Sequence, residues 1–175
     1  QSLPELQAGL PSGDIDLAAG FLPALGKQVR RTRLFHERFI YIARQGHPIV
    51  QGRLSREQLH DLAHVVASPP GTRHASHVER ALASPLVQAR VALRVRSFLC
   101  VAPIVSQTDL VAAVPSNLAA LMAPALNLQI IDPPIQIEGF DVTMAWHDRF
   151  QRDPASEWLR EQFLALFKDL DLVKG

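Results

Sequence analysis

The sequence has little cysteine, almost no net charge and no long apolar run. Its 175 residues include one cysteine, Cys100, so no intramolecular disulfide can form, and this suits a reducing compartment. We expect Cys100, which lies between apolar neighbours, to be a small buried residue rather than a nucleophile. No apolar run reaches the roughly 18 residues of a membrane span, and the first residues do not resemble a signal peptide. The sequence therefore predicts a cytoplasmic protein with no membrane partner.

The sequence also has no excess of positive or negative charge. Eighteen Lys and Arg residues stand against seventeen Asp and Glu residues, for a formal net charge of +1. A domain that binds nucleic acid normally has a strongly basic face, so this balance argues against direct DNA binding by these residues. Arg30, Arg31 and Arg33 form one local basic cluster, with Arg38 and Arg44 further on. We interpret this cluster as the solvent-exposed face of a strand.

Catalytic and cofactor motifs are absent from the sequence. There is no G-x-S-x-G nucleophile elbow, no phosphate-binding P-loop, no G-x-G-x-x-G after a strand and no H-E-x-x-H. His60 with His64 and His74 with His77 have spacings that metal ligands can use, but no cysteine or carboxylate accompanies them at a ligand spacing. We therefore predict no catalytic residue, no metal site, no cofactor and no enzyme activity.

Helical and strand patterns alternate along the chain. Ser55 and Gln58 have the spacing of a capping box, and Asp153 followed by Pro154 is typical of a helix start. Ser116 or Asn117 is a candidate cap for another helix. We predict helices at 3–10, 55–62, 75–82, 101–107, 117–126 and from 153 onward, and strands at 15–21, 33–43, 64–67, 90–96, 110–114, 128–131 and within 135–146. This alternation indicates parallel βαβ units in an α/β sheet.

Apolar faces are predicted for the last two helices. One face carries Leu118, Leu121, Met122 and Leu126, and the other carries Leu159, Phe163, Leu166, Phe167 and Leu170. Small polar residues lie near strand ends, at Gly71-Thr72-Arg73-His74, Ser97-Phe98 and Thr108-Asp109. Strand ends are where ligands bind in open α/β sheets, so a small acid in a cleft is the binding class that we predict. Taken singly, each of these positions is better explained by ordinary turn and capping chemistry.

Four segments resemble the effector-binding domain of LysR-type transcriptional regulators. They are Ser12 to Pro23 (SGDIDLAAGFLP), Leu34 to Phe39 with His47-Pro48, Thr108 to Pro115 (TDLVAAVP), and Trp146 to Phe150 with Asp153-Pro154 and Trp158-Leu159-Arg160. The last segment is the most specific. It is similar to the branch that contains regulators of nodulation and of naphthalene and nitrotoluene breakdown.

The resemblance implies a two-lobed α/β fold of the type II periplasmic-binding-protein class, with two crossover strands. Residues 1–25 and 131–175 would form lobe I, which would be incomplete at its N-terminus, and residues 26–130 would form lobe II. The winged helix-turn-helix DNA-binding domain of the family has no counterpart in these residues. DNA binding would therefore occur only through that absent N-terminal domain.

The resemblance also implies a set of ligand-binding residues, in a cleft between the lobes. These are Phe21, Glu37, Thr72, His74, Phe98, Pro103 and Thr108. Arg73 stands where the family has glycine, so the sequence departs from the family pattern at this position. Glu37 would repel a carboxylate ligand unless it is protonated or paired.

The function implied by the resemblance is effector sensing. A small organic effector, with an aromatic acid as one candidate, would shift the population toward closed lobes. Contacts in a homodimer or homotetramer would then carry the change to the DNA-binding domains. A stand-alone solute-binding protein of a transporter and a small α/β enzyme remain the alternatives.

Overall fold

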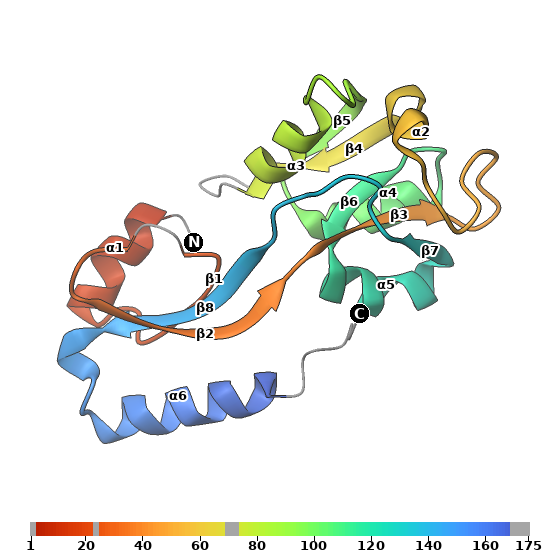
Figure 1. The fold of residues 1–175 in the computed structure, drawn as a ribbon. Helices are drawn as coiled ribbons and strands as arrows, with labels where there is room; N and C mark the ends of the chain where they lie inside the picture. The colour runs from red at the N-terminus through yellow and green to blue at the C-terminus, as the bar shows by residue number, and fades with distance from the viewer. Residues whose placement is uncertain (1–2, 23–24, 69–73, 169–175) are drawn as a thin grey trace. The chain divides into compact units, whose positions relative to one another are not determined.

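A computed structural model of the chain describes residues 3–22, 25–68 and 74–168, without the side chains of residues 74–76. Its described residues divide into two compact units. Unit 1 contains residues 1–37 and 140–174, and unit 2 contains residues 38–139. The chain passes into unit 2 after Glu37 and returns to unit 1 at Phe140 (Figure 1). The sequence of unit 2 is therefore continuous, and that of unit 1 is interrupted.

Unit 1 is built on an antiparallel sheet in which β8 is the central strand. Its strands are β1 (Ala18–Gly20), β2 (Val29–Glu37) and β8 (Phe140–His147), in the order β1-β8-β2. Helix α1 (Leu3–Ser12) packs through Leu10 against the face that carries Ala145. Helix α6 (Pro154–Phe167) covers the other face, where the Arg160 guanidinium lies 4.9 Å from the Trp146 ring centroid. The two helices thus bury opposite faces of β8 (Figure 1).

Unit 2 contains a three-stranded and a two-stranded sheet, which a bridge joins. The strands are β3 (Phe39–Arg44), β4 (Ala63–Ala67), β5 (Arg90–Val95), β6 (Ala112–Pro115) and β7 (Leu128–Ile131). Their orders are β6-β3-β7 and β4-β5, and a parallel bridge from His64 to Val111 connects β4 to the start of β6. The two sheets are therefore continuous through backbone hydrogen bonds.

Helices cover both faces of the unit 2 sheet. Helices α4 (Val101–Ser106) and α5 (Ser116–Leu126) pack on the face that carries Ile40, Ile42 and Val65. Successive side chains of a strand point to opposite faces, so Tyr41 and His64 belong to the other face. Helix α2 (Arg56–Asp61) lies there, since His64 bonds to the backbone of Leu59, and α3 (His74–Leu82) packs against β4. The core of unit 2 is a sheet between two helical layers.

The structure corrects three expectations about the strands. Parallel pairing is limited to β4 with β5 and the bridge to β6, whereas the other strand pairs of the described residues are antiparallel. The single strand predicted at 33–43 is two strands, because the chain leaves unit 1 between Glu37 and Arg38 and pairs with new partners. Strand β1 is also shorter than the strand predicted at 15–21.

The division of the chain also differs from the predicted lobe boundaries. Residues 26–37 belong to unit 1 rather than to the second lobe, because β2 pairs with β8 from Val29 to Glu37. Residues 131–139 belong to unit 2, since Ile131 pairs with Tyr41 and Glu138 lies 3.0 Å from His77. Both boundaries between the units are set by which strands pair with each other, and the sequence motifs end at other positions.

Helix caps agree with the sequence at two of three helices. Ser55 and Gln58 form the predicted capping box, and the Asp153 carboxylate accepts the Ser156 N–H at 2.8 Å. The predicted cap of α5 is wrong: Pro115 holds the cap position, makes no side-chain cap hydrogen bond, and Ser116 is already helical. None of the described helices is long and apolar enough to cross a lipid bilayer.

Two predicted apolar faces are wrong in part, and the predicted burial of Cys100 is wrong. Helix α5 packs through small residues, Ala119 and Ala123, and its Leu121 points away and is 74% exposed. In α6, Phe163 and Phe167 face the sheet, but Leu166 is 70% exposed. Leu170 lies outside the described residues. Cys100 is exposed because it ends a short 3-10 helix on the surface.

Candidate functional site

One edge of the unit 2 sheet collects the carboxyl ends of its parallel strands. Strand β4 ends at Ala67, β5 at Val95 and β6 at Pro115, and β3, which runs the opposite way, begins there at Phe39. The Ser68 N–H donates to the Val95 carbonyl at 2.7 Å, which holds the first two ends together. This edge, which we call the carboxyl edge of unit 2, is the position where open α/β sheets bind ligands.

Phe98 is the predicted site residue that lies at this edge. It opens the 3-10 helix η1 (Phe98–Cys100), directly after β5, and Ser97 caps that helix by accepting the Leu99 N–H at 3.2 Å. The Phe98 ring lies 6.3 Å from the Phe39 ring, centroid to centroid. Phe98 is half-buried and packs against the core, so part of its ring surface is available to a ligand.

Two helix N-termini lie at the same edge. Helix α5 begins at Ser116, directly after β6, and α3 begins at His74, shortly after β4. Ser116 is buried, and its backbone N–H donates to the Arg38 carbonyl at 2.9 Å. The first amides of a helix carry partial positive charge and favour an anion. The edge thus combines aromatic surface with groups that suit a carboxylate.

Thr108 lies at the opposite end of the sheet from Phe98. It follows α4, and its hydroxyl donates to the Ile104 carbonyl at 2.9 Å and accepts the Leu110 N–H at 3.3 Å. The chain then enters β6 beside the start of β4. The structure therefore does not bring Thr108 together with Phe98, and the Thr108 hydroxyl is used in a turn. Pro103 is exposed in the first turn of α4, and its carbonyl accepts a hydrogen bond from Ser106.

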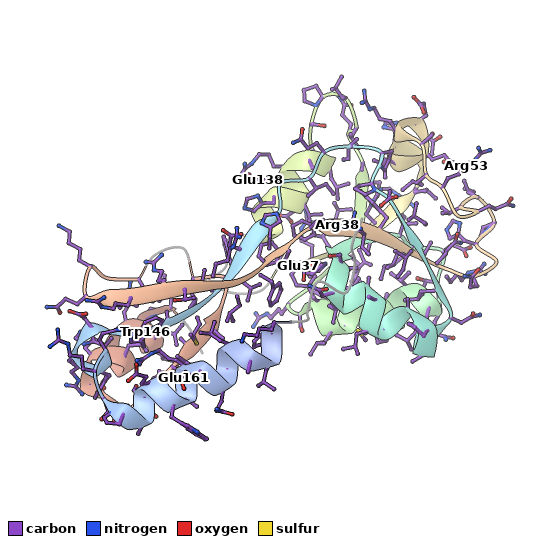
Figure 2. The ribbon with its side chains drawn as sticks, turned by 60° about the horizontal axis from the view of Figure 1, so that its bottom comes forward. Glu37, Arg38, Arg53, Glu138, Trp146 and Glu161 are labelled. Carbon is purple, nitrogen blue, oxygen red and sulfur yellow. The ribbon has the colours of Figure 1, made fainter. Side chains whose placement is uncertain are left out.

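In unit 1, Phe21 and Glu37 lie at one end of the sheet. Phe21 follows β1, and its ring meets the Phe140 ring edge-to-face at 5.5 Å. Glu37 ends β2 and pairs with Phe140 in the strand register. Phe140 thus links the two predicted residues. Glu37 is 4% exposed and is not without an interaction partner, and Figure 2 labels it at the end of β2.

The remaining predicted residues give less information. Thr72 and the side chain of His74 lie outside the described residues. His60 and His64, considered above as metal ligands, bond to the carbonyls of Val87 and Leu59 at 3.1 and 2.9 Å. Among the residues that the structure describes, no group of three or more His, Cys, Asp or Glu side chains has the arrangement of a metal site.

Sequence reasoning missed Phe39 and Ser116 as residues of the carboxyl edge. Phe39 was assigned to the middle of one long strand, and only the break after Glu37 puts it at a strand start. Ser116 was considered only as a helix cap. Its position directly after the apolar strand ending in Pro115 was the available signal, because residues that follow parallel strands meet at one edge.

The chain matches a family and several individual proteins of known type. The model of the LysR substrate binding domain matches residues 1–168. The HTH-type transcriptional activator NagR of a Ralstonia species is 32% identical over 164 residues, covering 94% of this chain and 54% of NagR. The HTH-type transcriptional regulator SyrM of Rhizobium etli is 32% identical over 158 residues, covering 90% of this chain and 46% of SyrM. The chain spans about half the length of these relatives.

Solved structures share the fold. A putative transcriptional regulator from Vibrio parahaemolyticus matches with a TM-score of 0.82 at 24% identity, covering 97% of this chain and 79% of that one. The effector-binding domain of QuiR in complex with shikimate matches with a TM-score of 0.70 at 14% identity, covering 96% of this chain and 79% of that one.

These findings confirm the predicted α/β fold class and the branch of naphthalene and nodulation regulators that the C-terminal motif indicated. The relatives are transcriptional regulators and not enzymes, as the absence of catalytic motifs predicted. The chain belongs to the LysR substrate-binding domain family.

Proposed function

We propose that this chain binds a small organic acid at the carboxyl edge of unit 2 and serves as the sensing part of a LysR-type transcriptional regulator. The observation that carries the proposal is that the Phe98 ring lies 6.3 Å from the Phe39 ring, and Phe39 pairs with Pro115, the residue directly before α5. A carboxylate suits the helix amides, and an apolar or aromatic body suits the ring. The shikimate bound to QuiR, which shares the fold, is a small organic acid.

The proposed role as a regulator concerns the whole protein, of which this chain would be one part. The relatives are HTH-type regulators about twice the length of this chain, so DNA binding would belong to a part outside these residues. The effector would favour one of two conformations, and a coupling of about 1–3 kcal/mol to the DNA-binding part is typical of such devices. A homodimer or homotetramer and a cytoplasmic location stay predictions. Sedimentation of the 19.3 kDa chain tests the first.

Calorimetric titration with benzoate, salicylate and shikimate tests the proposal. We expect at least one acid to bind without being converted. Phe98→Ala should weaken that binding about tenfold, the loss of one aromatic contact of ~1.5 kcal/mol. Leu99→Ala is the matched control, because Leu99 is the next residue and is 63% exposed. The affinity of Ser116→Ala for the same acid shows whether the side chain of the first residue of α5 contributes to binding.

Two outcomes would count against this function. Equal losses in the Phe98 and Leu99 variants would move the ligand away from the carboxyl edge. Turnover of any of the three acids would favour the enzyme alternative. Because Phe98 also packs against the core, thermal melting of each variant without ligand shows whether its fold is intact. Phe98→Leu keeps most of the apolar volume and separates loss of the ring from loss of packing.

A further inference from the structure

A cavity in unit 1 lies at the other end of β2 and β8 from Glu37. It has a volume of about 590 Å³ and is lined by α1, by the turn before β2 and by the last residue of β8: Gln7, Pro11, Gly26, Lys27, Gln28, Val29 and His147. Val29 pairs with His147, whereas Glu37 pairs with Phe140. Eight residues of strand at about 3.3 Å each separate the two ends by roughly 26 Å. This cavity, which we call the α1 pocket, is therefore remote from the Glu37 end of unit 1.

His147 lines the α1 pocket and carries a ring N–H that has no acceptor among the described residues. Its Nδ1 accepts the Arg149 N–H at 3.3 Å, so the neutral ring carries its proton on Nε2. Nε2 is buried and has no hydrogen-bond partner among the described residues, and the side chain is only 8% exposed. A buried donor without a partner costs about 1–3 kcal/mol, so an acceptor that reaches it would be well placed.

Lys27 adds a positive charge to the same pocket. It is exposed and takes part in no ion pair among the residues that the structure describes. The acidic side chain next to His147 in sequence, Asp148, is already paired with Arg30. Pro11 and Val29 provide apolar wall. Within the described part of the chain, the lining thus combines a lysine without an ion pair, an imidazole N–H without an acceptor and an apolar surface.

We propose that the α1 pocket binds a small organic monocarboxylate, with its carboxylate between Lys27 and His147 and its apolar body against Pro11 and Val29. Pockets of about 300–1,000 Å³ hold ligands of this size. A carboxylate accepts from both the ammonium and the imidazole N–H, and such charge-assisted hydrogen bonds are roughly twice as strong as neutral ones. The site is separate from the carboxyl edge of unit 2 and shares no residue with it.

Amide NMR of the whole chain during titration with benzoate tests the proposal. The backbone amides of residues 26–29 report on the α1 pocket, and those of Phe98 and Leu99 report on the carboxyl edge, so the two sites are distinguished in one experiment. We expect saturable shifts at residues 26–29. Lys27→Met and His147→Asn should each weaken that binding about three- to tenfold. The Asn side-chain oxygen can still accept the Arg149 N–H, so His147→Asn removes the Nε2 donor but keeps this hydrogen bond at the start of the 3-10 helix Asp148–Phe150.

Controls define what would overturn the proposal. Lys168→Met removes another exposed lysine of unit 1 and should leave the titration unchanged. Benzyl alcohol has the same ring without the carboxylate, and equal shifts with it would show that the charge is not recognised. Inorganic phosphate that binds as well as benzoate would show that the apolar wall contributes nothing. An absence of saturable shifts at residues 26–29 would rule out the site.

Discussion

At the scale of single residues, Glu37 is the buried acidic side chain among the ligand-binding residues that the family resemblance implies. It is buried at the end of β2, beside Phe140 and, through it, Phe21. The family resemblance places Glu37 in the effector site, and this remains a prediction. Its conversion to glutamine, which has the same shape without the charge, separates repulsion of the ligand from packing.

Glu37→Gln should strengthen benzoate binding to the chain about fivefold, because the variant removes roughly 1 kcal/mol of repulsion between two carboxylates. Calorimetry measures the change. Weaker binding in the variant would mean that the Glu37 carboxylate supports the ligand, and an unchanged affinity would place Glu37 outside the site. Melting without ligand shows whether loss of the Glu37 charge alters stability.

His64 controls a pH dependence of stability in unit 2. Its ring is fully buried, and its Nε2–H donates to the Leu59 carbonyl at 2.9 Å, while Nδ1 has no hydrogen-bond partner among the residues that the structure describes. Burial lowers the pKa of His64 below its ordinary 6.5, against a smaller opposite effect of the Leu59 hydrogen bond. The native state therefore resists a proton that the unfolded chain accepts.

The free energy of unfolding should consequently fall as pH drops below 6.5, by up to ~1.4 kcal/mol per pH unit from this residue. The contribution of His64 is complete above pH 6.5. Urea unfolding between pH 7.5 and 5.5 measures the slope, and the difference between the wild type and His64→Gln isolates this histidine. Identical slopes in the two proteins would contradict the prediction.

Prediction from sequence at this scale was limited by distance along the chain. Phe98 was found because it directly follows a clean alternating strand. Thr108 was grouped with it through its sequence motif, but a helix carries the chain to the other end of the sheet before Thr108. Which strand end a residue occupies depends on strand direction, and no local pattern encodes that direction.

At the scale of helices and strands, local signals predicted most positions correctly. The start of α2 followed from Ser55 and Gln58, and that of α6 from Asp153 and Pro154, because capping involves only neighbouring residues. The antiparallel pairing of β8 with β1 and β2 was missed, since the partners are more than a hundred residues apart. The exposure of Leu121 was missed because small residues, not the leucines, face the sheet.

The cap of α6 allows a direct test of its contribution. Asp153→Ala should lower the free energy of unfolding by about 1 kcal/mol, because the Ser156 N–H loses its acceptor. Asp153→Asn is the matched control and should retain most of the stability, since an amide oxygen also accepts from the first turn. Urea unfolding measures both variants. A similar loss in the Asn variant would assign the effect to charge at the helix N-terminus instead.

At the scale of the whole molecule, the two units have cores of different size. The buried cluster of unit 2 includes central strand β3, whose residues Phe39 to Ala43 are all buried. The described apolar residues that are buried in unit 1 are fewer: Leu10, Ala18, Leu22, Leu25, Phe140, Met144, Ala145 and Trp146. Local opening is easier where fewer apolar side chains are buried.

Hydrogen exchange should therefore be slower in unit 2 than in unit 1. We expect the amides of β3 and β6 to exchange only on global opening, and those of β1 and α1 to exchange earlier through local opening. Exchange followed by mass spectrometry of peptides measures both groups in one sample. Equal protection of the two groups would show that the units open as one cooperative body.

The interrupted sequence of unit 1 has a consequence for folding during synthesis. Strands β1 and β2 both pair with β8, so the sheet of unit 1 needs residues up to His147. All of residues 38–139 are translated before then. Because the chain is synthesised from its N-terminus, all of unit 2 has been made while β1 and β2 still lack their partner strand β8. The first segment to be synthesised, which contains β1 and β2, is therefore completed into a sheet only after unit 2 has been made.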